Sequence, residues 1–302
     1  MYRRLLLALD GSHLAEVVLP IVERLAPACG AAVLLLHVIE RSAPAKVHGE
    51  RHLRTVEEAE AYLGNLADGL RAQGISVETH AHEVPEGDVA RSIAAHAHEE
   101  RADVIVLCTH GSGGIRDLLS GSIAQQVLKR GTTPVLLVRS TPSGALVPFE
   151  PRRILVPLDA TAAAEVALEP ARQLARCLGA ILHLVMVVPT PGTLHGGRQA
   201  AAVALPTGIR AVLDLEQEEA QRYLQEMAER VRTMGVVVTT EVRRGETTAA
   251  LADEAAEPGV GLVVVATHGR VGVQAIWVGS VTARLLGRTR APLLLLRTIE
   301  DA

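Results

Sequence analysis

The chain has 302 residues, with 30 Lys and Arg against 34 Asp and Glu, so its formal net charge is −4 at pH 7. This mixed charge disfavours a general nucleic-acid binder, because such proteins need a basic surface to displace counterions. The hydrophobic share of 48% excludes a wholly disordered chain, and the aromatic share of 2% disfavours a surface that stacks bases.

The composition also bears on the compartment. The apolar run at residues 5–9 ends at Asp10 and is shorter than the apolar core of a signal peptide. No apolar run reaches the ~20 residues of a membrane span. The three cysteines, Cys29, Cys108 and Cys177, form no close pair, which disfavours a disulfide framework or a CxxC site. We therefore expect a soluble cytoplasmic protein with no membrane partner.

The second half of the chain repeats the first. RRLLLALD at residues 3–10 returns as RRILVPLD at 152–159, and THG and Gly-Ser each return 158 positions later, at 267–269 and 279–280. Repeats of this kind indicate a duplicated domain. The sequence predicts a first domain over 1–141, a Pro-rich linker over 142–151 and a second domain over 152–302. The second domain carries an insertion at 189–210, for which a lid and a disordered segment are both open.

Strands and helices alternate in each half. The first half predicts strands at 5–9, 33–39, 76–82, 104–108 and 135–138, with helices at 15–25, 56–73, 88–99 and 122–129 between them. The second half predicts strands at 154–158, 181–188, 236–242, 262–266 and 293–296, with helices at 163–178, 213–234, 247–256 and 280–286. Near-continuous aliphatic strands alternating with helices predict two doubly wound α/β domains, each with a five-stranded parallel sheet. Ligands of such sheets bind beyond the carboxyl ends of the strands.

Glycines after the fourth strand are the sharpest chemical feature. Nine residues separate Thr-His-Gly from Gly-Ser in both halves. Gly111, Gly121 and Ser122 of the first half therefore correspond to Gly269, Gly279 and Ser280 of the second. Such a segment before a helix can bind phosphate through backbone N–H groups, or can simply turn the chain. It is neither a P-loop nor a dinucleotide fingerprint, because no Gly-Lys-Ser/Thr follows and the glycines do not follow the first strand.

An aspartate follows the first strand of each half, Asp10 and Asp159. It can serve as a hydrogen-bond acceptor for a ligand or as an N-cap for the next helix. Ser12 and Thr161, soon after it, are also candidate N-caps.

Four histidines in the first half are candidate metal ligands. His80 and His82 share one strand face, while His96 and His98 lie two apart on a helix and point in different directions. None of the four recurs in the second half, so we predict no metal site. No catalytic constellation is evident either, so the protein is not expected to be an enzyme.

Taken together, these motifs resemble the universal stress protein family, as two tandem domains over nearly the whole chain. The resemblance implies a Rossmann-like fold of the adenine nucleotide alpha hydrolase type, with strand order 3-2-1-4-5 in each sheet. It also implies that the two domains pair through their last strands as an intrachain pseudo-dimer, and that two chains can form a homodimer.

The resemblance further implies an adenine nucleotide site in each domain. The ligand is ATP, with ADP and AMP as alternatives, bound with or without Mg. By position, the glycines and serines above hold the phosphates. The adenine and ribose of the nucleotide are held by Ala8, Asp10 and Val38 in the first domain and by Pro157, Asp159 and Val187 in the second. Ile123 and Val281 add backbone N–H groups, and the motif's first glycine is replaced by Cys108 and Ala266.

The resemblance thus predicts a nucleotide-binding sensor or regulatory module for the stress response, acting on an unidentified protein partner. At most slow ATP hydrolysis is expected, because the sequence shows no general base or metal cluster. The alternative is a stress-induced interaction scaffold that binds no nucleotide.

Overall fold

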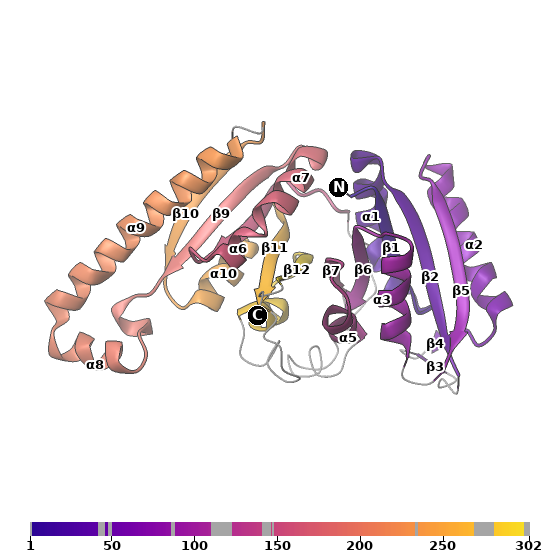
Figure 1. The fold of residues 1–302 in the computed structure, drawn as a ribbon, viewed down its shortest axis with the longest axis horizontal. Helices are drawn as coiled ribbons and strands as arrows, with labels where there is room; N and C mark the ends of the chain where they lie inside the picture. The colour runs from indigo at the N-terminus through magenta and orange to yellow at the C-terminus, as the bar shows by residue number, and fades with distance from the viewer. Residues whose placement is uncertain are drawn as a thin grey trace. The chain divides into compact units, whose positions relative to one another are not determined.

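A computed structural model gives the fold (Figure 1) and describes residues 2–41, 46–47, 50–85, 88–109, 123–140, 146, 148–232, 235–268 and 281–298. The chain divides into two compact units. The first contains Met1–Glu150 and Pro292–Arg297, and the second contains Pro151–Ala291 and Thr298–Ala302. The predicted domains differ from this division in two places: residues 292–297 belong to the first unit, and the division has no separate linker, since the first unit runs to Glu150 and the second begins at Pro151.

The first unit is built on a parallel sheet. Its strands are β1 (Arg4–Ala8), β2 (Ala32–Glu40), β5 (Val77–Val84), β6 (Val104–Thr109) and β7 (Val135–Arg139). Their order in the sheet is β5-β2-β1-β6-β7, which confirms the order 3-2-1-4-5. β12 (Leu293–Thr298) lies antiparallel to β7, with Leu294 opposite Leu136. Two short strands, β3 (Lys46–Val47) and β4 (Glu50–Arg51), form a separate antiparallel pair.

Helices cover both faces of this sheet (Figure 1), as right-handed crossovers between parallel strands require. They are the 3-10 helix η1 (Ala15–Val18), α1 (Leu19–Cys29), α2 (Val56–Ala72), α3 (Val89–Glu99) and α5 (Ile123–Arg130). Just after α2, the Gln73 amide donates to Glu23 of α1 at 2.9 Å, while α3 packs against α5. Thr55 caps α2 by accepting a hydrogen bond from the backbone N–H of Glu58 at 3.2 Å.

The second unit repeats the plan. β8 (Arg153–Leu158), β9 (Ile181–Val188), β10 (Val238–Arg244) and β11 (Val260–His268) lie in the order β10-β9-β8-β11 and are parallel. Its helices are α6 (Ala162–Glu165), α7 (Leu168–Leu178), α8 (Gly197–Ala204), α9 (Pro206–Arg232), α10 (Thr247–Ala255) and α11 (Val281–Arg288), with the 3-10 helix η2 (Pro191–Thr193). Among the described residues, no helix is both long enough and apolar enough to span a membrane.

The insertion at 189–210 is largely helical. It forms η2, α8 and the start of α9, which begins seven residues before the predicted position 213. The alanine-rich sequence of α8 has high helix propensity, and Pro206 suits the first position of a helix. Arg198 of α8 pairs with Glu216 of α9 at 2.6 Å.

Aliphatic side chains make up the centre of each sheet. Leu5, Leu6 and Leu7 of β1 are fully buried, as are Ile154 and Leu155 of β8. Burying these chains on both faces of a sheet contributes roughly 1.5–3 kcal/mol per side chain. The rigid sheet fixes where each strand ends, and the strand ends position the candidate site.

Candidate functional site

The predicted base and ribose residues of the first unit lie at one edge of the sheet. Ala8 ends β1 with Leu36 of β2 opposite it, and Asp10 lies two residues further on. Val38 of β2 and Cys108 of β6 lie near the carboxyl ends of the two strands that flank β1. The structure therefore brings these four predicted residues to the same end of three neighbouring strands.

The second unit brings the equivalent residues to the same place. Pro157 lies near the end of β8 opposite Val185 of β9, and Asp159 follows the strand. Val187 of β9 and Ala266 of β11 lie near the carboxyl ends of the flanking strands.

The predicted phosphate-binding residues lie outside the described residues. They are Gly111, Gly121, Ser122, Gly269, Gly279 and Ser280. Of the residues that follow them, Ile123 begins α5 and is 40% exposed, and Val281 begins α11.

Burial changes sharply along the central strands. Leu5–Leu7 have no exposed surface, whereas Ala8 and Cys108 at the carboxyl ends are partly exposed. Pro157 and Ala266 are also partly exposed in the second unit. Small, accessible side chains at this edge are what a ligand approaching the strand ends requires.

The two aspartates adopt one local geometry. The Asp10 Oδ1 accepts hydrogen bonds from the Ser12 backbone N–H at 2.9 Å and from the Ser12 hydroxyl at 2.6 Å. The Asp159 Oδ1 accepts the same pair from Thr161 at 3.1 and 2.6 Å. The N-cap of α6 is Thr161, whose hydroxyl accepts from the Ala164 N–H at 3.2 Å. The N-cap alternative for these aspartates is therefore wrong, because Asp159 holds Thr161, which is itself the N-cap. The expected N-cap role of Ser12 is also wrong: the N-cap of η1 is Leu14, and the Ser12 hydroxyl accepts from the Ala15 N–H at 3.3 Å.

A left-handed residue follows each aspartate. Gly11 has φ +84°, and Ala160 has φ +61°, in the region that favours glycine. A Cβ at Gly11 would lie 2.7 Å from Cδ1 and 2.9 Å from Cγ of Leu53. Leu53 therefore packs directly over the Asp10 turn.

Two further groups of the first unit border this turn. His37 of β2 is buried, and its Nδ1 donates to the Leu9 carbonyl at 2.8 Å. Burial lowers the pKa of His37, which favours the neutral ring. The Cys108 thiol donates to the Leu14 carbonyl at 3.0 Å, and burial raises its pKa to about 12. A thiol with that pKa is protonated at neutral pH, so it is a weak nucleophile.

Sequence reasoning missed a tyrosine–glutamate pair. Tyr223 of α9 donates its hydroxyl to Glu165 of α6 at 3.2 Å, and burial together with Glu165 raises the pKa of Tyr223. Burial and Glu16 act in the same way on the pKa of Tyr62 in the first unit. A signal existed: the tyrosines stand 161 positions apart, as do Val77 and Val238 at the starts of β5 and β10.

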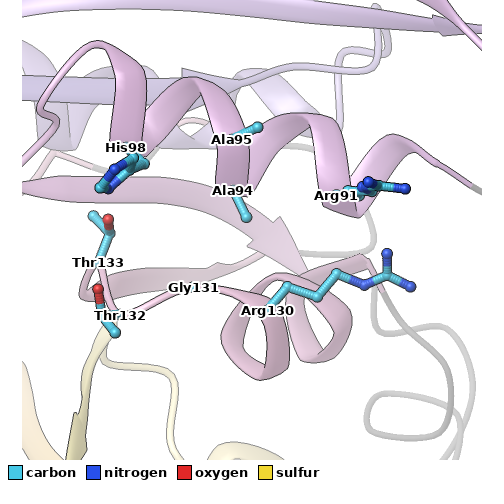
Figure 2. A pocket seen from close by; sticks show the side chains of 8 residues that line it. All are labelled: Arg91, Ala94, Ala95, His98, Arg130, Gly131, Thr132 and Thr133. Carbon is cyan, nitrogen blue, oxygen red and sulfur yellow. The ribbon is translucent and has the colours of Figure 1, made fainter.

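Two other features lie elsewhere on the first unit. His80, His82 and His96 come together, each with one ring nitrogen within 4.8 Å of the others, whereas His98 is not part of the group. His98 instead lines an open cavity of about 610 Å³ between α3 and the end of α5, together with Arg91 and Arg130 (Figure 2). None of the predicted site residues lines that cavity.

Comparison with known proteins identifies the fold's family. The model of the universal stress protein family matches residues 1–139 and again residues 150–297. The chain belongs to this family. The two matches confirm the tandem arrangement predicted from the repeats.

Relatives match either one repeat or the whole chain. A universal stress protein of Thermus aquaticus is 34% identical over 143 residues, covering 46% of this chain and 100% of that protein. The crystal structure of a universal stress protein from Archaeoglobus fulgidus covers 98% of this chain and 99% of its own, with a TM-score of 0.71 and 21% identity. A universal stress protein solved in complex with cAMP covers 50% of this chain and 99% of its own, with a TM-score of 0.34 and 22% identity.

Proposed function

We propose that this universal stress protein binds an adenine nucleotide, ATP in the first instance, at the carboxyl ends of the strands in both units. In this proposal it acts as a sensor or regulatory module of the stress response. The observation that carries the proposal is the aspartate turn, built alike in both units beside small, partly exposed residues of the central strands.

The turn suits a nucleoside. In each aspartate Oδ1 is held by two hydrogen bonds, so the carboxylate is fixed at the strand end and can accept hydrogen bonds from ribose hydroxyls. In this proposal the phosphates bind at the glycine and serine positions that both sequence repeats share, of which Gly121-Ser122 and Gly279-Ser280 directly precede α5 and α11 in the sequence. Helix N-termini favour anions there.

Chemistry on the nucleotide is proposed to be slow. The Cys108 thiol is held protonated, and Ala266 replaces it in the second unit, so neither unit offers a thiolate nucleophile at this position. We therefore propose a binding module that at most hydrolyses ATP slowly, with Mg as an accompanying ion of the phosphates.

Calorimetric titration tests the proposal. ATP and AMP are titrated into the full chain with and without Mg, and the same titrations are made on the Gly121→Val/Gly279→Val double variant. We expect ATP binding with a Kd on the order of micromolar, lost in the double variant because valine side chains block close approach to phosphate.

Single variants assign the sites. Asp10→Asn and Asp159→Asn preserve an acceptor for the local turn but remove the charge. Each should therefore weaken one of two sites by about tenfold. Asp253→Asn, at an exposed position of α10, is the matched control and should leave both sites unchanged. If millimolar ATP gives no heat with folded protein, the nucleotide function is refuted and the interaction scaffold becomes the better account.

A further inference from the structure

The first unit carries a three-histidine cluster that the proposed function does not use. His80 and His82 lie on β5, the edge strand, and His96 lies on α3. The ring centroids are 5.2 Å apart for His80–His82, 4.8 Å for His80–His96 and 4.6 Å for His82–His96. One nitrogen of each ring lies within 4.8 Å of the others.

Hydrogen bonds orient two of the three rings. The Nδ1 of His96 donates to the Ser92 carbonyl at 2.8 Å, which leaves the electron pair on its Nε2. The Nε2 of His82 and the Ser92 hydroxyl form a hydrogen bond of 2.9 Å. The Nδ1 of His82 is buried without a hydrogen-bond partner among the described residues. A ring that donates one N–H to a carbonyl or hydroxyl and presents its other nitrogen is the usual state of a metal-ligating histidine.

The surroundings of His82 also favour the neutral ring that metal binding needs. Burial and the neighbouring His96 and His80 rings lower the pKa of His82, while the negative charge of Glu99 opposes this effect. Neutral imidazole is a ligand for zinc and for the later first-row divalent metals.

The equivalent position in the second unit shows what this part of the fold can contain. In the register of the first unit, Leu36 and Val38 of β2 lie beside His80 and His82 of β5. In the second unit, Val185 and Val187 of β9 lie beside Glu241 and Arg243 of β10 in the same way. Counting from the N-caps Asp88 and Glu246, His96 of α3 corresponds to Glu254 of α10.

In the second unit, the guanidinium of Arg243 already supplies a cation at this position. The Nε of Arg243 donates to Glu254 at 2.7 Å and lies 2.9 Å from a Glu241 oxygen. His183 uses both ring nitrogens, with Thr239 at 2.8 Å and Glu254 at 3.0 Å. The second unit therefore fills this position with a guanidinium, whereas the first unit presents imidazole nitrogens there.

We propose that His80, His82 and His96 bind one divalent transition-metal ion of the zinc class, with the fourth coordination position open to solvent. Tetrahedral Zn–N bonds of about 2.0–2.1 Å place ligand nitrogens about 3.3 Å apart. The three nitrogens lie within 4.8 Å of one another, so this spacing requires small ring rotations, and the exposed His80 is the least hindered of the three. The ion joins the edge strand β5 to α3 and therefore stabilises the first unit when bound.

Cobalt titration of the untagged full chain tests the site. Co²⁺ should bind at about one ion per chain with the visible absorption of tetrahedral cobalt, and Zn²⁺ should displace it while Mg²⁺ should not. His80→Gln and His82→Gln should each lower the affinity at least ~10-fold, and Ser92→Ala should lower it by roughly 10-fold. His98→Gln on the same helix α3 is the matched control and should bind cobalt like the wild type.

The outcome is decided even if a variant fails to fold. Zn²⁺ should raise the thermal midpoint of the wild type, and anomalous scattering from zinc-soaked wild-type crystals should place the ion between β5 and α3. Unchanged binding in a folded His80→Gln/His82→Gln variant, or no zinc peak at the cluster, overturns the proposal. ATP titration of the same variants separates this site from the proposed function, since β2 lies between β5 and β1.

Discussion

The packing of Leu53 over the Asp10 turn makes Gly11→Ala an informative substitution. Gly11 has φ +84°, and its Cβ would lie 2.7 Å from the Leu53 Cδ1. Gly30 has φ +63°, and a Cβ there would meet nothing within 4 Å. The two glycines therefore share the left-handed backbone and differ in steric contact, so Gly30→Ala is the matched control.

The expected magnitudes follow from these two terms. A left-handed alanine costs roughly 1–2 kcal/mol, offset by about 0.4–1 kcal/mol from the reduced entropy of the unfolded chain. Gly30→Ala should thus lower the free energy of unfolding by about 1 kcal/mol. At Gly11 the overlap with Leu53 adds roughly 1–3 kcal/mol, because Leu53 must leave its rotamer or the turn must shift.

Urea unfolding followed by circular dichroism measures both variants and the Gly11→Ala/Leu53→Ala pair. Leu53→Ala should recover most of the additional loss at Gly11, so the double-mutant cycle should show a coupling of about 1 kcal/mol or more. Equal losses for Gly11→Ala and Gly30→Ala, at unchanged urea dependence, would contradict the close approach of Leu53.

Three further predictions concern the strand ends. Ala160→Gly relieves the left-handed alanine at φ +61° and should raise the free energy of unfolding by up to about 1 kcal/mol, seen as a higher thermal midpoint. Tyr223→Phe removes the hydrogen bond to Glu165 and should cost about 0.5–1.5 kcal/mol in urea unfolding, while an unchanged urea midpoint would mean that the bond contributes nothing. Burial raises the pKa of Cys108 from 9.0 to about 12, so the folded state retains a proton that the unfolded chain loses above pH 9. The protonated Cys108 thiol therefore contributes fully to the free energy of unfolding below pH 9, and this contribution falls as the pH rises toward 12. Cys108→Ala should flatten this decline. Iodoacetamide should label Cys108 more slowly in native protein than in urea.

The sheet was predictable because its signal is local. A buried parallel strand reads as an unbroken aliphatic run, and Leu5–Leu7 show that pattern. The second half repeats this pattern in β8, where Ile154 and Leu155 are buried. The two copies together mark the end of each first strand, and with it Asp10 and Asp159.

Contacts between distant elements were not predictable in the same way. The alternation of His80 and His82 is visible in the sequence, but the approach of His96 depends on how α3 packs beside β5. Spacing on one helix gives the relative directions of His96 and His98 and says nothing of which strand either one meets. The Tyr223–Glu165 pair joins helices 58 positions apart and was missed for the same reason.

Comparing the two units separates the features that both share from those that differ between them. The aspartate turn recurs although Ala160 stands where the first unit has Gly11, and an alanine is strained in the left-handed region, so the second turn forms at a cost in stability. A strained residue at the same place in a recurring turn supports the proposed ligand at both strand ends. The polar cluster beside the edge strand differs between the units. In the first unit it consists of three imidazoles, and in the second unit the same positions contain an arginine between two glutamates. The proposed nucleotide site, common to both units, and the proposed metal site, particular to the first, therefore predict different stoichiometries: two nucleotides and one metal ion per chain.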